Sequence, residues 1–221
     1  NGSLATMTSS DNITWTGTFT PSSDVEDATN VMSLATSYTD TAGNAGPSAT
    51  TDNYAVDTIR PTVAAFTMSD TALISGETST VTLQFSEAVA SFSSDDDITV
   101  QNGSLATMTS SDNITWTGTF TPTSDVEDAT NVLTLATTYT DTAGNAPAST
   151  STTDNYTVDT TAATVVAFTL SDSALKIGDT ATVTLQFSEA VAGFSSDADV
   201  TVQNGSLATM TSSDNITWTG T

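Results

Sequence analysis

Carboxylate, amide and hydroxyl groups are the only side chains of this sequence that predict a chemical role. The chain of 221 residues has 26 Asp and Glu against 2 Lys and Arg, and it contains neither His nor Cys. This composition excludes His- or Cys-based zinc sites, cysteine nucleophiles, Ser-His triads and disulfide bonds. What remains is oxygen chemistry, either the binding of a hard cation or acid-base work by paired carboxylates.

Some of these carboxylates occupy positions where the sequence pattern predicts a buried side chain. Glu87 continues an alternating apolar row that ends at Phe85, and Asp141 continues a row that ends at Tyr139. Asp40 is the counterpart of Asp141 about 101 residues earlier. A buried carboxylate requires a cation or several hydrogen-bond donors, so these positions are the first candidates for a binding site.

The elements that must position these carboxylates are set by an internal repeat. Residues 1–18, NGSLATMTSSDNITWTGT, return unchanged at 102–119 and at 204–221, a period of one small domain. We predict one complete unit at 57–158, preceded by the back half of a unit at 1–56 and followed by the front half of a unit at 159–221. We expect the chain to be a section of a longer tandem array.

Alternation of apolar residues with Thr predicts strands in each unit. Val81 and Leu83 alternate with polar neighbours, as do Trp116 and Phe120, and helical periodicity is nearly absent. The expected strands of the complete unit span about 62–68, 79–87, 97–101, 104–109, 113–121, 131–140 and 153–159. About seven strands of this kind predict an all-β fold of tandem immunoglobulin-like antiparallel β-sandwiches with Greek-key topology. The segment SDVED at 124–128 predicts a short helical turn through a capping box.

In such a Greek key the second and sixth strands end where the first and third strands begin, so distant acidic residues converge there. The only basic residue expected near this end is Arg60, whose counterpart is Ala162, so a salt bridge cannot neutralise both units. Calcium fits because it accepts six to eight oxygens in irregular geometry, whereas magnesium demands a near-octahedral shell. The candidate calcium ligands are Asp57, Glu87, Asp97, Asp141 and Asn145 in the complete unit, Asp40 and Asn44 before it, and Asp159, Glu189 and Asp199 after it. The alternative is that Glu87 and Asp141 reach solvent or accept backbone N–H bonds.

Several segments resemble the bacterial Ig-like repeats of giant surface adhesins and biofilm-associated proteins. The resemblance rests on VDTIRPTV, SDTALISGETSTVTLQFSEAV, TPTSDVEDATN and YTDTAGN, and it extends over the whole chain. It implies long extender stalks, often stiffened by calcium, that hold an adhesive tip away from the cell or build a biofilm matrix. It also implies an extracellular or cell-surface location.

Three functions therefore stand as hypotheses. The first is the stalk of a secreted or surface-anchored bacterial adhesin, whose partners are the neighbouring repeats of its own chain. The second is a subunit of a self-assembling extracellular filament, in which residues 159–221 of one copy and 19–56 of another complete a sandwich. The third is an accessory carbohydrate-binding module of a secreted hydrolase. A net charge of −24 argues against nucleic acid as a partner, no stretch predicts a membrane span, and an active site repeated along an array is not expected, so we predict that the chain is not an enzyme.

Overall fold

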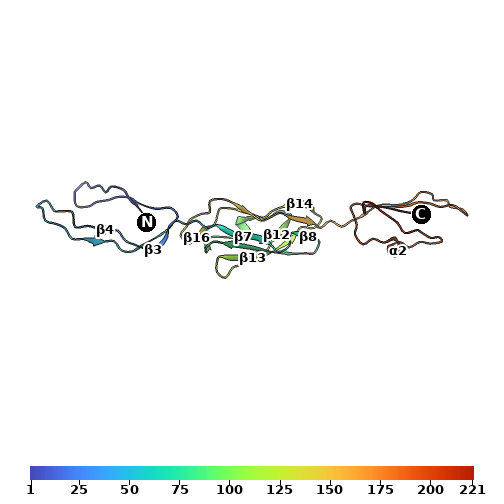
Figure 1. The fold of residues 1–221 in the computed structure, drawn as a ribbon, viewed down its shortest axis with the longest axis horizontal. Helices are drawn as coiled ribbons and strands as arrows, with labels where there is room; N and C mark the ends of the chain where they lie inside the picture. The colour runs from blue at the N-terminus through green and yellow to red at the C-terminus, as the bar shows by residue number, and fades with distance from the viewer. The chain divides into compact units, whose positions relative to one another are not determined.

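The computed structural model describes all residues from 1 to 221, and they form two compact units. Unit 1 spans Asn1–Thr160. It contains residues 1–56 and 57–158, which we predicted as a first half-repeat and a complete repeat and which keep these names below. Unit 2 spans Thr161–Thr221. Strands dominate throughout, and the only helices are the single turns α1 (Ser94–Asp97) and α2 (Ser196–Asp199), so the predicted all-β class is confirmed (Figure 1). Neither helix is long and apolar enough to cross a membrane.

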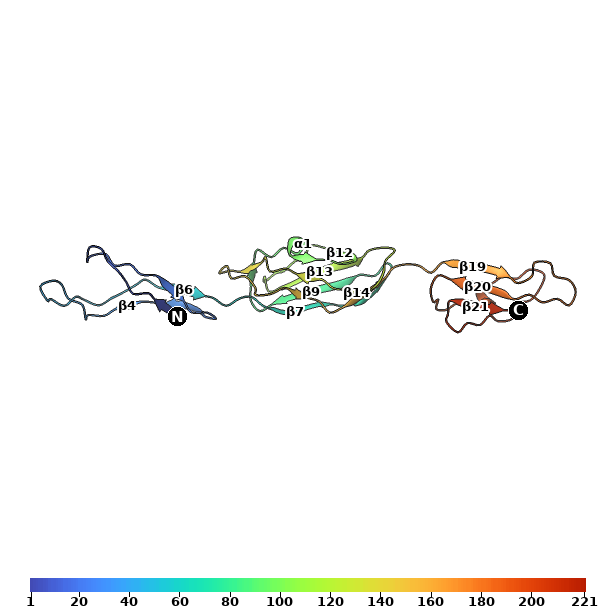
Figure 2. The ribbon, with the colours of Figure 1, turned by 90° about the horizontal axis from the view of Figure 1, so that it is seen from above.

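One face of the complete repeat is a four-stranded antiparallel sheet. Its strands in spatial order are β12 (Gly103–Leu105), β13 (Thr115–Pro122), β9 (Ser79–Phe85) and β7 (Val63–Met68) (Figure 2). In β9 the side chains of Val81, Leu83 and Phe85 are buried, and the Thr and Gln residues between them point outward. The predicted alternation therefore sets which side of this sheet meets the core.

The opposite face is made of shorter pieces. They are β11 (Ile98–Thr99) with β15 (Thr134–Leu135) and β17 (Ser151–Thr152), β14 (Glu127–Asn131) with β18 (Tyr156–Asp159) and β8 (Ala72–Ile74), and β10 (Val89–Ala90) with β16 (Thr140–Asp141). All of these pairs are antiparallel except β18 with β8, which run parallel. The four-stranded sheet and these shorter sheets enclose one core between them, which confirms the predicted β-sandwich.

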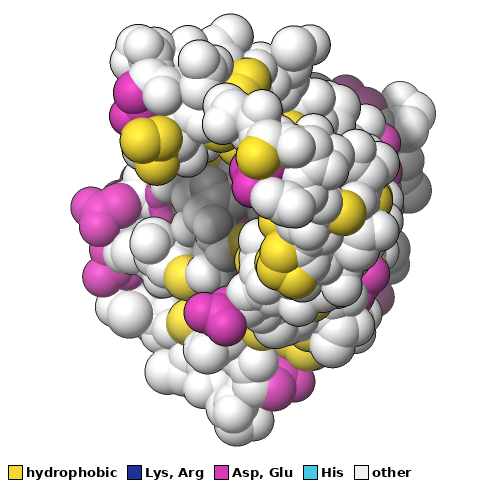
Figure 3. Space-filling model, turned by 90° about the vertical axis from the view of Figure 1, so that its left-hand side faces the viewer, with side chains coloured by type: hydrophobic (Ala, Val, Ile, Leu, Met, Phe, Trp, Pro, Cys, Tyr) yellow, Lys and Arg dark blue, Asp and Glu magenta, His cyan; other side chains and the backbone are white.

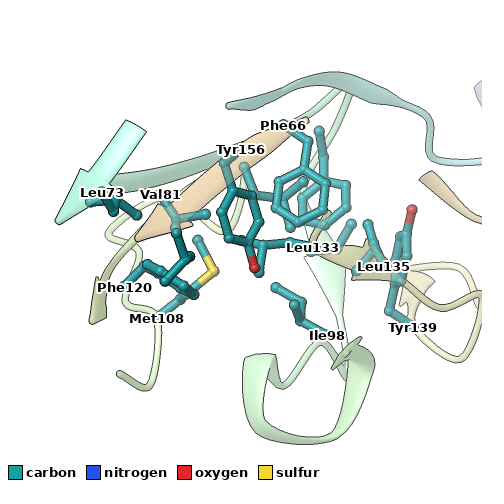
Figure 4. Packing of buried hydrophobic residues seen from close by; sticks show 14 residues of the cluster. Phe66, Leu73, Val81, Ile98, Met108, Phe120, Leu133, Leu135, Tyr139 and Tyr156 are labelled. Carbon is teal, nitrogen blue, oxygen red and sulfur yellow. The ribbon is translucent and has the colours of Figure 1, made fainter. Parts of the chain in front are cut away.

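Aromatic and aliphatic side chains from both faces fill the space between them. Phe120 and Tyr156 are fully buried, and their rings meet edge to face with centroids 5.2 Å apart. Figure 4 shows Phe120 beside Met108 at one end of this cluster and Tyr139 beside Leu135 at the other. Burial of this apolar cluster is the main term that stabilises the complete repeat.

The structure differs from the expected elements at residues 124–140 in particular. Residues 124–128 do not form a helical turn: a turn at Ser124 and Asp125, with φ of 57° at Asp125, leads into β14, whose Glu127 pairs with Asp159. The single strand expected at 131–140 is divided into β15 and β16. Pairing with β18 accounts for the first difference, because a strand neighbour satisfies the backbone groups that a capping box would otherwise satisfy.

The other two segments repeat parts of this architecture. The first half-repeat contains β1 (Gly2–Leu4), β2 (Phe19–Pro21), β3 (Glu26–Asn30), β4 (Ser33–Leu34), β5 (Ala49–Thr50) and β6 (Tyr54–Asp57). Unit 2 contains β19 (Val165–Leu170), β20 (Val183–Phe187) and β21 (Thr217–Gly220), which lie side by side in one sheet (Figure 2). Both segments expose large apolar side chains. Figure 3 shows both hydrophobic and acidic side chains on the surface that faces the viewer, with no basic side chain in view.

Candidate metal centre

Three carboxylates from distant parts of the sequence meet at one end of the complete repeat. Asp57 ends β6, Glu87 follows β9, and Asp141 ends β16. One carboxylate oxygen from each lies within 4.8 Å of the others. We call these three residues the junction cluster, because Asp57 is also where the chain passes from the first half-repeat into the complete repeat.

Asp141 is held in place by its own loop. Its Oδ1 accepts hydrogen bonds from the backbone N–H groups of Ala143 (2.9 Å) and Asn145 (2.8 Å), and its Oδ2 accepts one from the Asn145 side chain (2.7 Å). The carboxylate is almost wholly buried. Burial by itself would raise the pKa of Asp141, but the bonds from Asn145, Gly144 and Ala143 outweigh it and hold the pKa below its ordinary value. Asp141 is therefore an anion at neutral pH, and it accepts backbone N–H bonds as the alternative hypothesis expected.

Asn145 also links this loop to the residue that joins the two repeats. Its Nδ2 donates to the backbone oxygen of Asp57 at 3.2 Å, in addition to the bond to Asp141. Two members of the junction cluster are thus fixed by one amide side chain. Asn145 therefore positions the carboxylate of Asp141 and holds the backbone of Asp57.

The pKa of Glu87 is shifted in the opposite direction from that of Asp141. Burial raises its pKa, and repulsion from Asp141, Asp57 and Glu26 raises it further, with no hydrogen bond acting against these effects. Arg60 does not neutralise the cluster, because its guanidinium donates to the backbone oxygen of Ala146 at 2.8 Å. The cluster therefore combines closely spaced negative charges with no cationic side chain bound to them.

Glu87→Gln should stabilise the complete repeat at neutral pH in the presence of a chelator. A carboxyl group with a raised folded-state pKa gives its largest contribution to stability below its ordinary pKa of 4.5, and this contribution is lost as the pH rises through the folded-state pKa. The variant has no carboxyl group to ionise and so avoids this loss. Its gain in unfolding free energy should be less than about 1 kcal/mol, because the group is only partly buried. Urea unfolding at several pH values measures the difference, which should vanish in acid. A variant less stable than the parent at neutral pH would contradict this assignment.

Other predicted ligands lie outside the junction cluster. Asp97 is buried, and its carboxylate accepts hydrogen bonds from the Ser93 backbone N–H (2.9 Å) and from the Thr138 hydroxyl. Asp199 repeats the first bond, accepting from the Ser195 N–H at 2.8 Å. These bonds close the single helical turns α1 and α2, so both aspartates have a local structural role in the absence of an ion.

The half-repeats contain parts of the same arrangement. Asp40 and Asn44 form the same loop as Asp141 and Asn145, with 2.8 Å from the Asn44 side chain to the carboxylate, but Asp40 is exposed. Asp159 is exposed at the end of β18 in unit 1, and Glu189 is half-buried in unit 2. Asp57, Glu87 and Asp141 are the only three acidic side chains that the structure groups closely enough for a common ion.

Sequence reasoning missed Glu26. It lies in β3 opposite Asp57, and its charge contributes to the raised pKa of Glu87. The residue belongs to the SDVED segment of the first half-repeat, whose copy at 124–128 we predicted only to form a short helical turn. The end of one repeat is adjacent to the start of the next through Asp57, so an acid there acts on the site of the following repeat.

Comparison with known proteins places the chain in a family. No curated protein and no solved structure matches it. The sequence profile described as bacterial Ig-like domain matches three consecutive segments, residues 1–56, 57–158 and 159–221. These matches together span the whole chain, in agreement with the β-sandwich of residues 57–158 and with the internal repeats. The chain therefore belongs to the family of bacterial Ig-like domains.

Proposed function

We propose that the chain is part of the stalk of a secreted or surface-anchored bacterial adhesin, supporting cell adhesion or biofilm formation, and that calcium stiffens it. Tandem bacterial Ig-like repeats without a disulfide suit a spacer whose rigidity comes from non-covalent interactions. The observation that carries the proposal is the junction cluster of Asp57, Glu87 and Asp141.

The location of this cluster gives the ion a mechanical role. Glu87 follows a strand of the four-stranded sheet, Asp141 ends a strand of the opposite face, and Asp57 belongs to the connection between repeats. An ion bound to all three would connect both faces of one sandwich to the segment that precedes it. The angle between consecutive repeats would then be restricted whenever external calcium is sufficient.

Calcium suits these ligands better than magnesium. Carboxylates in unequal environments can bind a calcium ion together with backbone oxygens and water, since its shell is irregular and flexible. Two negative charges fixed beside the raised-pKa carboxyl of Glu87 favour a divalent cation over a single basic side chain. Extracellular calcium modules bind with dissociation constants of about 10⁻⁴–10⁻³ M, a range in which external calcium would control occupancy.

The Trp residue of the complete repeat does not favour a carbohydrate-binding module. Trp116 is only partly exposed and packs against Phe92, with ring centroids 4.9 Å apart and planes at 71°. Sugar stacking needs an accessible ring face. Trp116 instead belongs to the edge of the core, as its inward position in the sequence pattern predicts.

Calcium should raise the thermal midpoint of the complete repeat. An ion at ten times its dissociation constant adds about 1.4 kcal/mol to the folded state, which corresponds to roughly 5–10 °C for a domain of this size. The test compares the full chain in millimolar calcium and in chelator by calorimetry, with small-angle scattering to measure its maximum dimension. Under the proposal both the midpoint and the dimension increase with calcium.

Variants separate a specific site from general screening of charge. Glu87→Gln should abolish the response to calcium, although it stabilises the chain in chelator. The variant should therefore be more stable than the parent in chelator and less stable than the parent in calcium. Asp96→Ala is the matched control, because it removes an exposed acid of the same repeat where the next repeat already has Ala198. An unresponsive parent, or an Asp96→Ala variant that loses the response equally, would rule out this calcium site and leave a passive spacer.

A further inference from the structure

We propose that Asn113 of the complete repeat is an acceptor site for an Asn-linked sugar. The complete repeat contains three tripeptides of the form Asn-x-Ser or Asn-x-Thr, at 102–104, 113–115 and 155–157. Sugars are attached to the Asn side chain within this pattern. The sequence does not distinguish the three tripeptides, whereas the structure does. The inference is independent of calcium binding and of the adhesin role.

The side-chain amide of Asn102 is held inside a polar network. Its Nδ2 donates to the carboxylate of Asp128 at 2.8 Å and to the side-chain oxygen of Asn131 at 2.6 Å. Asn131 is almost wholly buried, and its own amide donates to the backbone oxygens of Asp128 at 3.0 Å and Tyr156 at 3.2 Å. A transferring enzyme could use Asn102 only by breaking this network, and breaking it would leave buried polar groups without partners.

Asn155 is exposed, but its side-chain amide also has partners within the chain. Its Nδ2 donates to the backbone oxygen of Ala129 at 3.0 Å, and its Oδ1 accepts from the backbone N–H of Asn131 at 3.0 Å. The middle residue of this tripeptide, Tyr156, is fully buried in the core. The amide of Asn155 therefore joins the start of β18 to β14 and is not available to an enzyme.

Asn113 differs from both, because it takes part in its turn through its backbone alone. Its N–H donates to the Oγ of Ser110 at 2.9 Å, and its carbonyl oxygen accepts from the N–H of Val89 at 3.0 Å. The residue is exposed, and its side-chain amide makes no hydrogen bond within the chain. The hydroxyl of Thr115, the third residue of the tripeptide, makes none either. Asn113 is therefore the one acceptor candidate of the complete repeat whose amide and hydroxyl are both available.

The turn that presents Asn113 is fixed by local hydrogen bonds. The Oδ1 of Asp112 accepts from the backbone N–H groups of Ile114 and Thr115, each at 2.9 Å. The same turn occurs at Asn12 and Asn215, with φ of 58° and 57°, and both residues are exposed. A modification that depends on this turn should therefore recur once in each copy of the repeat.

The reaction is the transfer of a sugar from a nucleoside diphosphate sugar. The Nδ2 of Asn113 forms a bond to the anomeric carbon of the sugar, while the bond from that carbon to the diphosphate oxygen breaks. The nucleoside diphosphate leaves with the electron pair, and the amide gives one proton to a basic group of the transferring enzyme. Nothing is oxidised or reduced. A soluble donor of this class suits an acceptor that is exposed in the folded chain.

The sugar would lie at the same end of the complete repeat as the junction cluster. The carbonyl oxygen of Ile114 accepts from the N–H of Phe85 at 2.9 Å, and that of Asn113 accepts from Val89, two residues after Glu87. A neutral, hydrated group at this end adds bulk without adding to the net charge of −24.

Incubation of the folded full chain with UDP-glucose and a soluble glucosyltransferase that recognises Asn-x-Ser/Thr tests the site. Intact mass measures the number of glucose units. The parent chain should gain glucose, and Asn113→Gln should carry one unit fewer, as should Thr115→Ala. Thr115→Ser keeps the acceptor pattern and should retain the unit. A parent chain that gains no glucose, or an Asn113→Gln variant that carries as many units as the parent, would overturn the proposal.

Ser104→Ala and Thr157→Ala are the matched controls, because each removes the hydroxyl of one of the other two tripeptides. Neither should change the number of glucose units. Loss of one unit in either control would contradict the assignment to Asn113 alone, since the hydrogen bonds of Asn102 or Asn155 would then give no protection. Circular dichroism of each variant separates loss of the acceptor pattern from loss of the fold.

Mild alkali tests the linkage, which matters in a chain that is rich in Thr and Ser. Alkali eliminates sugars from Thr and Ser hydroxyls but leaves Asn-linked sugars in place. The glucose of the parent chain should therefore resist alkali. Release of the glucose would place it on a hydroxyl group and overturn the proposal.

Discussion

The Phe120→Ala variant is expected to lose about 3–5 kcal/mol of unfolding free energy in the complete repeat. Phe120 is fully buried and contacts the ring of Tyr156, so its truncation leaves a cavity between the two sheets. Small domains are stable by about 5–15 kcal/mol, and the variant should be close to unfolding at room temperature. Urea denaturation followed by circular dichroism measures the loss.

Phe19→Ala provides a control inside the same chain. Phe19 occupies the same place in the repeat and contacts Tyr54 in the same way, but it is only partly buried. Its truncation should cost less than about 1 kcal/mol, since side chains that remain partly hydrated gain less from burial. Similar losses at positions 19 and 120 would mean that the core of the complete repeat is not the origin of the effect.

The second large effect is expected for Asp141→Ala, about 3 kcal/mol in the complete repeat. This substitution removes the acceptor for two backbone N–H groups and the Asn145 side chain in a buried site. Donors left without a partner in such a site cost about 1–3 kcal/mol each, partly relieved by water. The thermal midpoint and the free energy of unfolding in chelator measure the change.

The loop of the first half-repeat is the control for Asp141. Asp40→Ala removes the same hydrogen bonds from Ala42 and Asn44, but water can replace them because Asp40 is exposed. Its effect on the free energy of unfolding should be much smaller than that of Asp141→Ala. If Asp40→Ala and Asp141→Ala lower the unfolding free energy equally, the hydrogen bonds of the loop account for the loss and the burial of Asp141 does not contribute.

The pH dependence of Asp141 runs opposite to that of Glu87. A carboxyl group with a lowered folded-state pKa stabilises the fold above its ordinary pKa of 3.8, and this stabilisation is lost as the pH falls through the folded-state pKa. Asp141→Ala should therefore differ most from the parent near neutral pH and converge with it in strong acid. Glu87→Gln also converges with the parent in acid, but from higher stability.

Several turns and loops have the same conformation in each copy of the repeat, so the local sequence determines them. The turn after Ser110 forms identically in its three copies, with φ of 58° at Asn12 and Asn113 and 57° at Asn215. The loop from Asp40 to Asn44 has the same hydrogen bonds as its copy in the complete repeat, although its surroundings differ. Such features depend on side chains bonding to backbone groups a few residues away, so they could be predicted from short segments.

Strand order and length were predictable only in part. Alternation identified the long strands β7, β9 and β13, because one face of each is buried and the other is hydrated. The short strand β8 was not predicted, since its pairing is a parallel contact with β18, about 85 residues along the sequence. A pattern within one segment contains no information about a neighbour that arrives from so far away.

The junction cluster, too, was predictable only in part from the sequence. Inward parity singled out Glu87 and Asp141, and the structure places one carboxylate oxygen of each within 4.8 Å of a carboxylate oxygen of Asp57. The contribution of Glu26 and the separation of Asp97 from the cluster required the tertiary structure. Both depend on how far each strand runs before it ends, which differs by one or two residues from any estimate based on alternation.

Identical segments that differ in burial show most directly what cannot be predicted from the sequence. Met7, Met108 and Met210 occupy the same place in the unchanged repeat, yet Met7 is 41% exposed and the other two are 3% exposed. The sequence by itself determined the repeat, the β-class, the turns and the positions suited to a core. Only the tertiary structure decided which of those positions became buried, because burial depends on neighbouring strands that the segment does not contain.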